Sequence, residues 1–213
     1  KRVLVLGMGA GSLPSLLGHC CPEAVTIDAV ELDSRVAEAA CGPLGLDTRR
    51  VDVHVHDAMA WLSQRAQDSL AMRYDLIFVD IFDGSNRTPE GFYSDAFMRD
   101  LRACLAPRGL VMHNLHSGTA DLDNRLDDAC QAYSSAFPEA ACRVPALRPG
   151  NTIVATAAFE GAFDSLDAMK ASAQHARQER RGLQFDASAR LEGLRVIAQG
   201  SRSGATRDSS HSV

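Results

Sequence analysis

The sequence predicts an α/β domain whose sheet is mostly parallel and closes with an antiparallel hairpin. Apolar runs of strand length alternate with segments of helical period as far as Phe137, a pattern typical of a parallel sheet covered by helices on both faces. Beyond that point, residues 143–147 and 152–158 flank the turn sequence Arg148-Pro149-Gly150-Asn151. Such a turn between two strand-like runs indicates a hairpin at the edge of the sheet.

Five apolar runs predict the parallel strands, at residues 3–6, 26–30, 51–56, 76–79 and 110–114. Helices are predicted at residues 14–17, 34–40, 58–65, 95–105 and 121–137. In the fourth helix apolar side chains recur every four residues, and Pro107-Arg108-Gly109 is expected to end it. The single tryptophan, Trp61, is interpreted as packing on the third helix.

We divide the chain into the α/β domain (1–160), a polar, helical C-terminal extension (161–199) and a disordered tail (200–213). The tail is rich in serine, glycine and charge and has little to bury. A basic cluster at Arg177, Arg180 and Arg181 is interpreted as a solvated helix face. Because the chain opens directly on a strand without an initiator methionine, we expect a fragment or a processed form, with any upstream domain or targeting peptide outside this sequence.

The composition argues against several classes of partner. A net charge of -5 from interspersed acidic and basic residues gives no broad cationic field for nucleic acid or an anionic membrane. No stretch approaches the roughly 18 to 20 apolar residues of a membrane span. Six cysteines lie scattered without a C-x-x-C pair, so we expect free thiols in a reducing, intracellular compartment and no metal site. The expected partners are small molecules or proteins.

A glycine-rich loop, Gly7-Met8-Gly9-Ala10-Gly11, follows the first strand and leads into a helix. Glycines allow the backbone to approach a ligand closely, and a helix N-terminus favours a carboxylate or phosphate. A plain packing turn is the alternative. The third glycine comes two residues after the second, unlike the G-x-G-x-x-G of dinucleotide-binding proteins, and this spacing is found in adenosylmethionine-dependent transferases.

Acidic residues follow the next two strands. Glu31 ends the second strand, where its carboxylate could accept both hydroxyls of a ribose. Asp57, followed by Ala58, comes after the third strand and could bind the adenine amino group or serve only as a helix N-cap. Because ligands of open α/β sheets collect at the carboxyl ends of the strands, these positions together indicate one nucleoside site.

The fourth strand is followed by Asp80-Ile81-Phe82-Asp83-Gly84, which places two carboxylates beside the same cleft. With the glycine loop, Glu31 and Asp57, this run from Val3 to about Phe159 resembles the spermidine synthase-like branch of the Rossmann-like class I methyltransferase fold. The stretches Gly11-Ser12-Leu13-Pro14 and Asp28-Ala29-Val30-Glu31-Leu32-Asp33 are similar to eukaryotic methyltransferase-like proteins that modify a translation elongation factor.

The resemblance implies S-adenosylmethionine, or its decarboxylated form, bound by Gly7, Gly9, Gly11, Glu31, Asp57, Ala58 and Asp80. In aminopropyltransferases the first aspartate of the pair helps deprotonate the attacking amine and the second orients it, which assigns catalytic roles to Asp80 and Asp83. This chain departs from those enzymes at Ala10, where they carry aspartate, and at Gly84, where they carry proline. Their small N-terminal β-domain is not in this sequence either. A methyltransferase acting on an amine, for example that of a protein, is therefore preferred over an aminopropyltransferase.

Two further interpretations stay open. The chain could be a catalytically inactive subunit of a larger assembly, since this fold can serve without catalysis, and a homodimer is also compatible with the sequence. His113, Asn114 and His116 cluster at the end of the fifth strand, near where an acceptor would sit. Histidines satisfied within a loop are the alternative explanation of that cluster.

Overall fold

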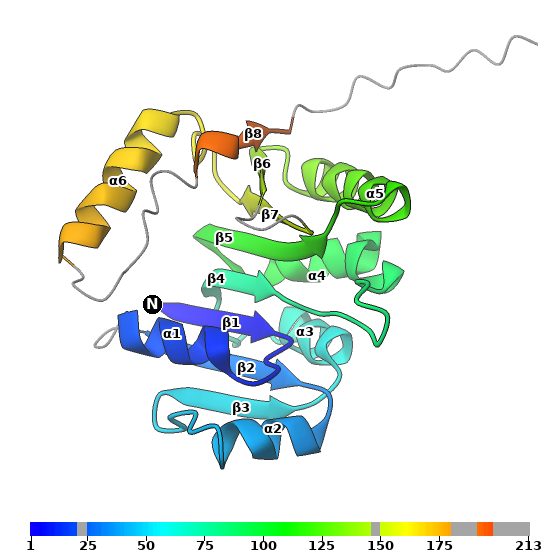
Figure 1. The fold of residues 1–213 in the computed structure, drawn as a ribbon, viewed down its shortest axis with the longest axis vertical. Coiled ribbons are helices and arrows are strands. Elements are labelled where there is room, and N and C mark those ends of the chain that lie inside the picture. The colour runs from blue at the N-terminus through cyan, green and yellow to red at the C-terminus, as the bar shows by residue number, and fades with distance from the viewer. Residues whose placement is uncertain (21–24, 146–149, 180–190, 198–213) are drawn as a thin grey trace, which may run out of the picture.

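The computed structural model describes residues 1–20, 25–145, 150–179 and 191–197. Its centre is an eight-stranded sheet with the order β3-β2-β1-β4-β5-β7-β6-β8 (Figure 1). The strands are β1 (Arg2–Leu6), β2 (Thr26–Glu31), β3 (Val51–Val55), β4 (Tyr74–Val79), β5 (Leu105–His116), β6 (Ala140–Pro145), β7 (Asn151–Ala157) and β8 (Arg195–Val196). The first five strands are parallel, and β7, β6 and β8 continue the sheet as antiparallel neighbours. The predicted parallel sheet with a terminal hairpin is confirmed.

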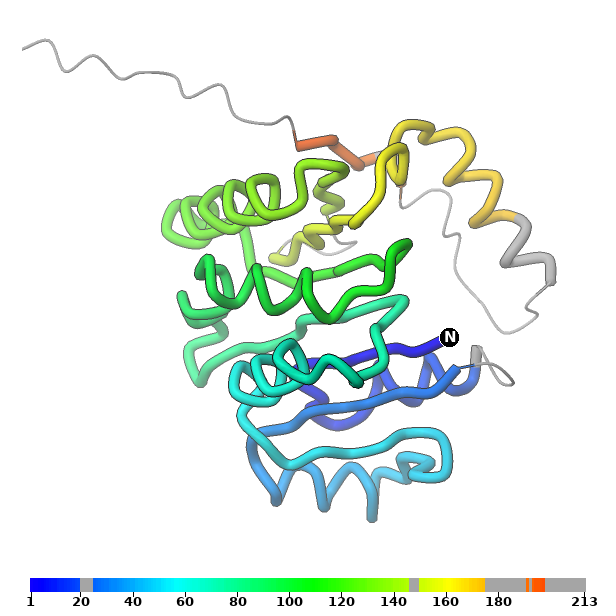
Figure 2. The backbone as a smooth tube through the Cα atoms, turned by 180° about the vertical axis from the view of Figure 1, so that it is seen from behind, coloured from blue at the N-terminus to red at the C-terminus, as the bar shows by residue number. Residues whose placement is uncertain are grey.

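Helices cover both faces of the sheet (Figures 1 and 2). They are α1 (Ser12–Cys20), α2 (Ser34–Cys41), α3 (Ala58–Gln67), α4 (Asp95–Cys104), α5 (Ala120–Ala136) and α6 (Leu166–Glu179), with short 3-10 helices η1 (Glu90–Tyr93) and η2 (Leu191–Gly193). Successive residues of a strand point to opposite faces. Accordingly Val3 and Val5 pack with α1 and α2, whereas Leu4 and Leu6 belong to the larger core under α3, α4 and α5.

Strand β5 begins earlier than the sequence predicts. Pro107-Arg108-Gly109, expected as a helix stop, lies inside the strand, because the pairing shifts register between Tyr74↔Leu105 and Leu76↔Leu110. The extra residues form a bulge, which is one of the few places where a strand tolerates proline. A side chain at Gly109 would meet the Tyr74 carbonyl oxygen at 2.9 Å, so glycine allows this close approach.

The C-terminal extension, expected to be helical, also contributes a strand. α6 is helical, but β8 pairs antiparallel with β6 and joins the sheet. Leu194, just before β8, and Phe163 pack with Cys142 of β6. The sequence signal was weak because an edge strand of two residues has no periodicity to detect. Residues 180, 181 and 200–213, and the side chain of Arg177, lie outside the described part of the chain.

The described cysteines Cys41, Cys104, Cys130 and Cys142 are free thiols. Burial raises the pKa of the Cys104 and Cys130 thiols to about 11, which makes them small core residues rather than nucleophiles. Within the described residues, no helix is both long and apolar enough to cross a membrane.

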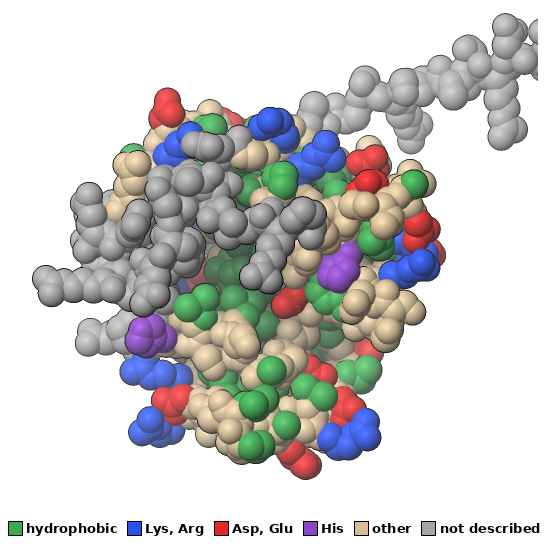
Figure 3. All heavy atoms as spheres, in the orientation of Figure 1, with side chains coloured by type: hydrophobic (Ala, Val, Ile, Leu, Met, Phe, Trp, Pro, Cys, Tyr) green, Lys and Arg blue, Asp and Glu red, His purple; other side chains and the backbone are tan. Residues whose placement is uncertain are grey.

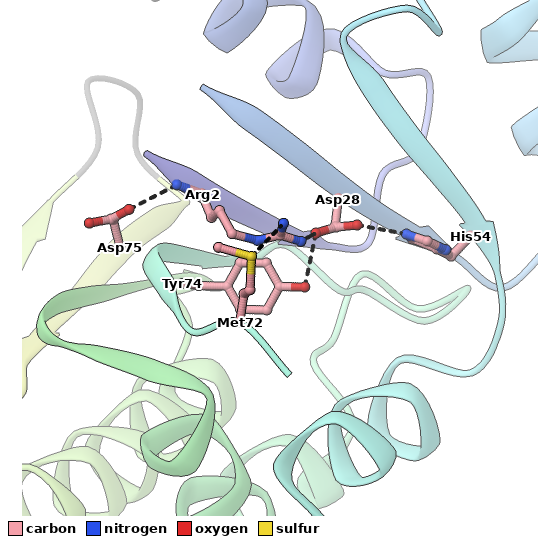
Figure 4. A network of polar contacts seen from close by, with 6 residues as sticks. All are labelled: Arg2, Asp28, His54, Met72, Tyr74 and Asp75. Atoms are coloured by element: carbon pink, nitrogen blue, oxygen red, sulfur yellow. Dashed lines mark hydrogen bonds and ion pairs between the residues drawn. The ribbon is translucent and has the colours of Figure 1, made fainter. Parts of the chain in front are cut away.

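A polar network around the buried Asp28 connects β1, β2, β3 and β4 (Figure 4). Asp28 of β2, only 3% exposed, accepts hydrogen bonds from Arg2 Nη2 at 2.7 Å and from Tyr74 Oη at 2.9 Å, and its other oxygen lies 2.9 Å from His54 Nε2. Trp61 of α3 covers the network, with its ring 5.2 Å from that of His54, which confirms its packing role. Burying a carboxylate costs free energy unless it is paired, so the folded sheet depends on these contacts of Asp28.

We expect Asp28→Ala to lower the free energy of unfolding by about 3 kcal/mol, because it leaves a partly buried guanidinium and a buried phenol without their acceptor. Urea unfolding measures the change. Asp127→Ala is the matched control, since Asp127 is an exposed helix residue 3.5 Å from Arg143, and it should hardly move the unfolding midpoint. Equal losses in the two variants would show that the network does not stabilise the sheet.

Candidate functional site

A cleft of about 830 Å³ opens where β1, β2, β3 and β4 end. Its lining includes most of the residues that the sequence predicts for a nucleoside site: Gly7, Gly9, Glu31, Asp57, Ala58, Asp80 and Asp83. A concave site of this size suits a small-molecule ligand. The structure thus brings together residues that lie as far apart in the sequence as Gly7 and Asp83.

The three glycines of the loop have different environments, although all have positive φ. A side chain at Gly7 would meet the backbone oxygen of Asp80 at 2.3 Å, whereas one at Gly9 would meet no protein atom within 4 Å. A side chain at Gly11 would meet the Leu46 side chain at 3.3 Å, and Gly11 is not in the cleft lining. Gly7 therefore permits a close approach of two strand ends, and Gly9 borders open space in the cleft. Gly11 instead lies close to Leu46 and Ala40 in the core beside α2.

Glu31 is oriented by the backbone around it. Its Oε2 accepts a hydrogen bond from the Gly9 amide at 2.8 Å, and its Oε1 accepts one from the Asp33 amide at 3.1 Å. These contacts hold a half-buried carboxylate at the cleft wall and link it to the glycine loop. A carboxylate can accept further hydrogen bonds, such as those of a ribose diol, because its two oxygens have about four lone-pair sites.

The third strand end supplies Asp57 and Ala58. Asp57 Oδ1 accepts from the Ala60 amide at 2.8 Å and caps α3, so the N-cap role considered for it is present, while the residue also lines the cleft. Leu32 lines the cleft as well and is 70% exposed, which sequence reasoning missed. The sequence does contain an indication of this role, because an apolar residue directly after the strand-ending Glu31 lies at the cleft and can cover a planar ring of a ligand.

Asp80 lies half-buried at the fourth strand end. Its amide donates to the Leu6 carbonyl at 2.8 Å, and its Oδ1 accepts from Asn114 Nδ2 at 2.9 Å. Asp83 is exposed instead, and its Oδ1 accepts from the amides of Arg87 and Ser85 at 3.0 and 2.7 Å. These backbone hydrogen bonds lower the pKa of Asp83 and make its carboxylate the centre of a turn.

The cluster at the end of β5 divides between the two faces of the sheet. His113 is fully buried under α5, where its Nδ1 lies 2.9 Å from Tyr133 Oη, and burial lowers its pKa to about 3, so it is a neutral core residue. Asn114 points instead to Asp80, and the His116 ring lies 4.4 Å from that of Phe82, which lines the cleft. The alternation of side chains along a strand explains this division.

No group of three or more potential metal ligands occurs among the residues that the structure describes. Acidic, basic and apolar side chains are interspersed over the visible face of the molecule, outside the grey residues (Figure 3). The site contains a glycine loop, the carboxylates of Glu31, Asp57 and Asp80 at three strand ends, and apolar side chains. This arrangement suits a nucleoside with a charged substituent.

The fold and this cleft define a Rossmann-like class I methyltransferase fold. The crystal structure of human methyltransferase-like protein 13 in complex with SAH superposes with a TM-score of 0.71 at 23% identity, covering 86% of this chain and 83% of that chain. The family model described as spermine/spermidine synthase domain matches residues 1–160, and the chain belongs to this family.

Curated relatives include proteins of two activities. The eEF1A lysine and N-terminal methyltransferase of Bos taurus is 29% identical over 119 residues, covering 53% of this chain and 17% of its own length. The polyamine aminopropyltransferase of Vibrio vulnificus (strain CMCP6) is 29% identical over 140 residues, covering 65% of this chain and 44% of its own length. This chain therefore spans less than half the length of either relative.

We expect Gly9→Val to abolish binding of S-adenosylhomocysteine while the domain still folds, because the added side chain enters the open space that Gly9 borders. Gly45→Val is a matched control: Gly45 also has positive φ (+74, against +53 at Gly9) and no neighbour within 4 Å, but it lies outside this cleft. Both should lose about 1 to 2 kcal/mol of stability from the left-handed backbone, and only Gly9→Val should lose binding in calorimetry. Normal binding by Gly9→Val would reduce the loop to a packing turn.

Proposed function

We propose that this chain is an S-adenosylmethionine-dependent transferase that methylates an amine acceptor, with a protein amine as the preferred class. The observation that carries the proposal is the convergence of the open glycine loop, the oriented carboxylate of Glu31 and the half-buried Asp80 on one cleft. Membership of a family that includes enzymes using adenosyl cofactors supports the choice of ligand.

In this proposal the cofactor extends across the ends of the strands. Glu31 binds the ribose hydroxyls, while Asp57 and the Ala58 backbone border the adenine and Leu32 covers its ring. The glycine loop passes under the amino-acid moiety, near the N-terminus of α1, where a carboxylate is favoured. Asp80, beside Gly7, would then face the reacting end of the cofactor.

The chemistry requires alignment more than activation. The amine lone pair attacks the methyl carbon, the carbon–sulfur bond breaks and its electron pair stays on sulfur, which converts the sulfonium into the neutral thioether of S-adenosylhomocysteine. The protein must place the amine in line with that bond and keep it unprotonated. Asp80 is proposed to accept the amine proton or to stabilise the charge of the methylated amine, because its half-buried carboxylate follows β4 directly beside Gly7.

An aminopropyltransferase is the second candidate, and the presence of both Asp80 and Asp83 at the cleft favours it. Methylation is preferred because the Asp83 carboxylate is engaged by two backbone amides of its own turn, and because the chain carries Ala10 and Gly84 in place of the aspartate and proline of spermidine synthases. The non-enzymatic alternative is a catalytically inactive subunit of a larger assembly.

Binding tests the cofactor assignment. Glu31→Gln should weaken S-adenosylhomocysteine binding by roughly ten- to a hundredfold, because an amide cannot accept both ribose hydroxyls through charge-assisted hydrogen bonds. Isothermal calorimetry measures the affinity. Glu38→Gln, the same change on the exposed face of α2, should bind as the wild type does. Equal affinity of the two variants would exclude the ribose role.

Turnover tests the proposed reaction. The wild type should transfer labelled methyl groups from S-adenosylmethionine to recombinant eEF1A, or aminopropyl groups from decarboxylated S-adenosylmethionine to putrescine if the second candidate holds. Asp80→Asn keeps the size of the side chain but removes its charge, and should lower the rate by about a hundredfold or more with little effect on folding. A wild type that binds the cofactor but transfers neither group would favour the inactive subunit.

A further inference from the structure

We infer that Asn114 and Asn151 form a hydrogen-bonded relay that positions the Asp80 carboxylate for the cationic centre of the reaction. The inference rests on the proposed function and adds two positioning residues to it. Asn151 Nδ2 donates to Asn114 Oδ1 at 2.8 Å, and Asn114 Nδ2 donates to Asp80 Oδ1 at 2.9 Å. All three side chains are half-buried.

The relay spans three neighbouring strands at the cleft edge of the sheet. Asp80 directly follows β4, Asn114 lies on β5, and Asn151 is the first residue of β7. The pairing Val79↔His113 puts Asp80 level with Asn114, and the antiparallel pairing His116↔Asn151 places the start of β7 at the carboxyl edge of β5. The parallel strands and the hairpin thus both supply polar groups to the same point.

The direction of the hydrogen bonds determines how Asp80 is held. An asparagine amide has one accepting and one donating end. Because Asn151 donates to the oxygen of Asn114, the NH₂ group of Asn114 faces Asp80, and a flipped amide would lose both contacts. Asp80 Oδ1 is therefore an acceptor within the protein, and its Oδ2 is left to face the ligand. The hydrogen bond from Asn114 thus fixes the orientation of the Asp80 carboxylate.

Neither asparagine is among the residues that line the cleft. Packing alone does not require amides at these positions, where apolar side chains would avoid the cost of burying polar groups. Any influence on the ligand must accordingly pass through Asp80. A double-mutant cycle can therefore distinguish a positioning role from direct contact, because residues that act through one another give losses of affinity that do not add.

The test compares two ligands that differ at the reacting centre. Sinefungin resembles S-adenosylmethionine but carries a carbon with an amino group where the cofactor has its methylated sulfur, whereas S-adenosylhomocysteine has no positive charge there. The wild type should bind sinefungin more tightly, because its ammonium faces Asp80. Asn114→Leu should reduce this preference about fivefold or more, since an oxygen of Asp80 then faces an apolar side chain and the carboxylate loses its orientation. Affinity for S-adenosylhomocysteine should stay within about twofold.

Asn151→Leu should reduce the preference by a smaller factor, about threefold, because Asn114 remains but its amide is no longer oriented. The double variant should be no worse than Asn114→Leu alone, since Asn151 acts through Asn114. Asn124→Leu, on the exposed surface of α5, is the matched control and should retain the wild-type preference. Thermal unfolding of each variant checks the fold.

The outcomes separate the two proposals. A wild type that binds neither ligand overturns the proposed function and the relay together. A wild type that binds both ligands equally, an undiminished preference for sinefungin in Asn114→Leu, or additive losses in the double variant overturn the relay but leave the cofactor site standing. An equal weakening of both ligands by Asn114→Leu would assign the asparagine a structural role and also overturn the relay.

Discussion

The close approach of two strand ends at Gly7 is the constraint on which the site depends. The Asp80 amide donates to Leu6, and the Asp80 carbonyl oxygen occupies the space that a side chain at Gly7 would need. This contact sets the glycine loop directly beside the fourth strand end. The contact therefore determines the distance between the glycine loop, proposed to hold the cofactor, and the Asp80 carboxylate, proposed to act on the acceptor. Because the contact is between backbone groups, this distance does not depend on the choice of side chains.

Stability and ligand binding are separated along the strands. The Asp28 network lies within the sheet, where Arg2, Tyr74 and His54 from the first, fourth and third strands meet a buried carboxylate. The cleft lies at the carboxyl ends of the strands. A parallel sheet makes this separation natural, because the loops that carry function all leave from one edge and buried pairing can accumulate at the other.

Much of the architecture could be predicted from the sequence because it follows from periodicity and from residues directly after strands. Gly7, Glu31 and Asp80 are examples, since each marks the end of an apolar run. The bulge at Pro107, the strand β8 and the contact between Asn114 and Asn151 could not be predicted in this way. They depend on strand register and on partners distant in the chain, and a single residue of register changes which face a side chain occupies. The sequence left the N-cap role of Asp57 as one of two alternatives and did not indicate the turn role of Asp83, because an aspartate that caps a turn and one that faces a ligand have the same sequence signature.

The reversal of chain direction at β7 has a consequence for how such a domain can diversify. In the parallel strands the cleft is built from residues that follow each strand, whereas β7 reaches the same edge with its first residue, immediately after the β6–β7 connection. A substitution of Asn151 would therefore alter the support of Asp80 without disturbing the loops after β1, β2 and β3. The orientation of the carboxylate proposed to act on the acceptor can thus diverge through the first residue of β7, while the loops proposed to hold the cofactor stay the same.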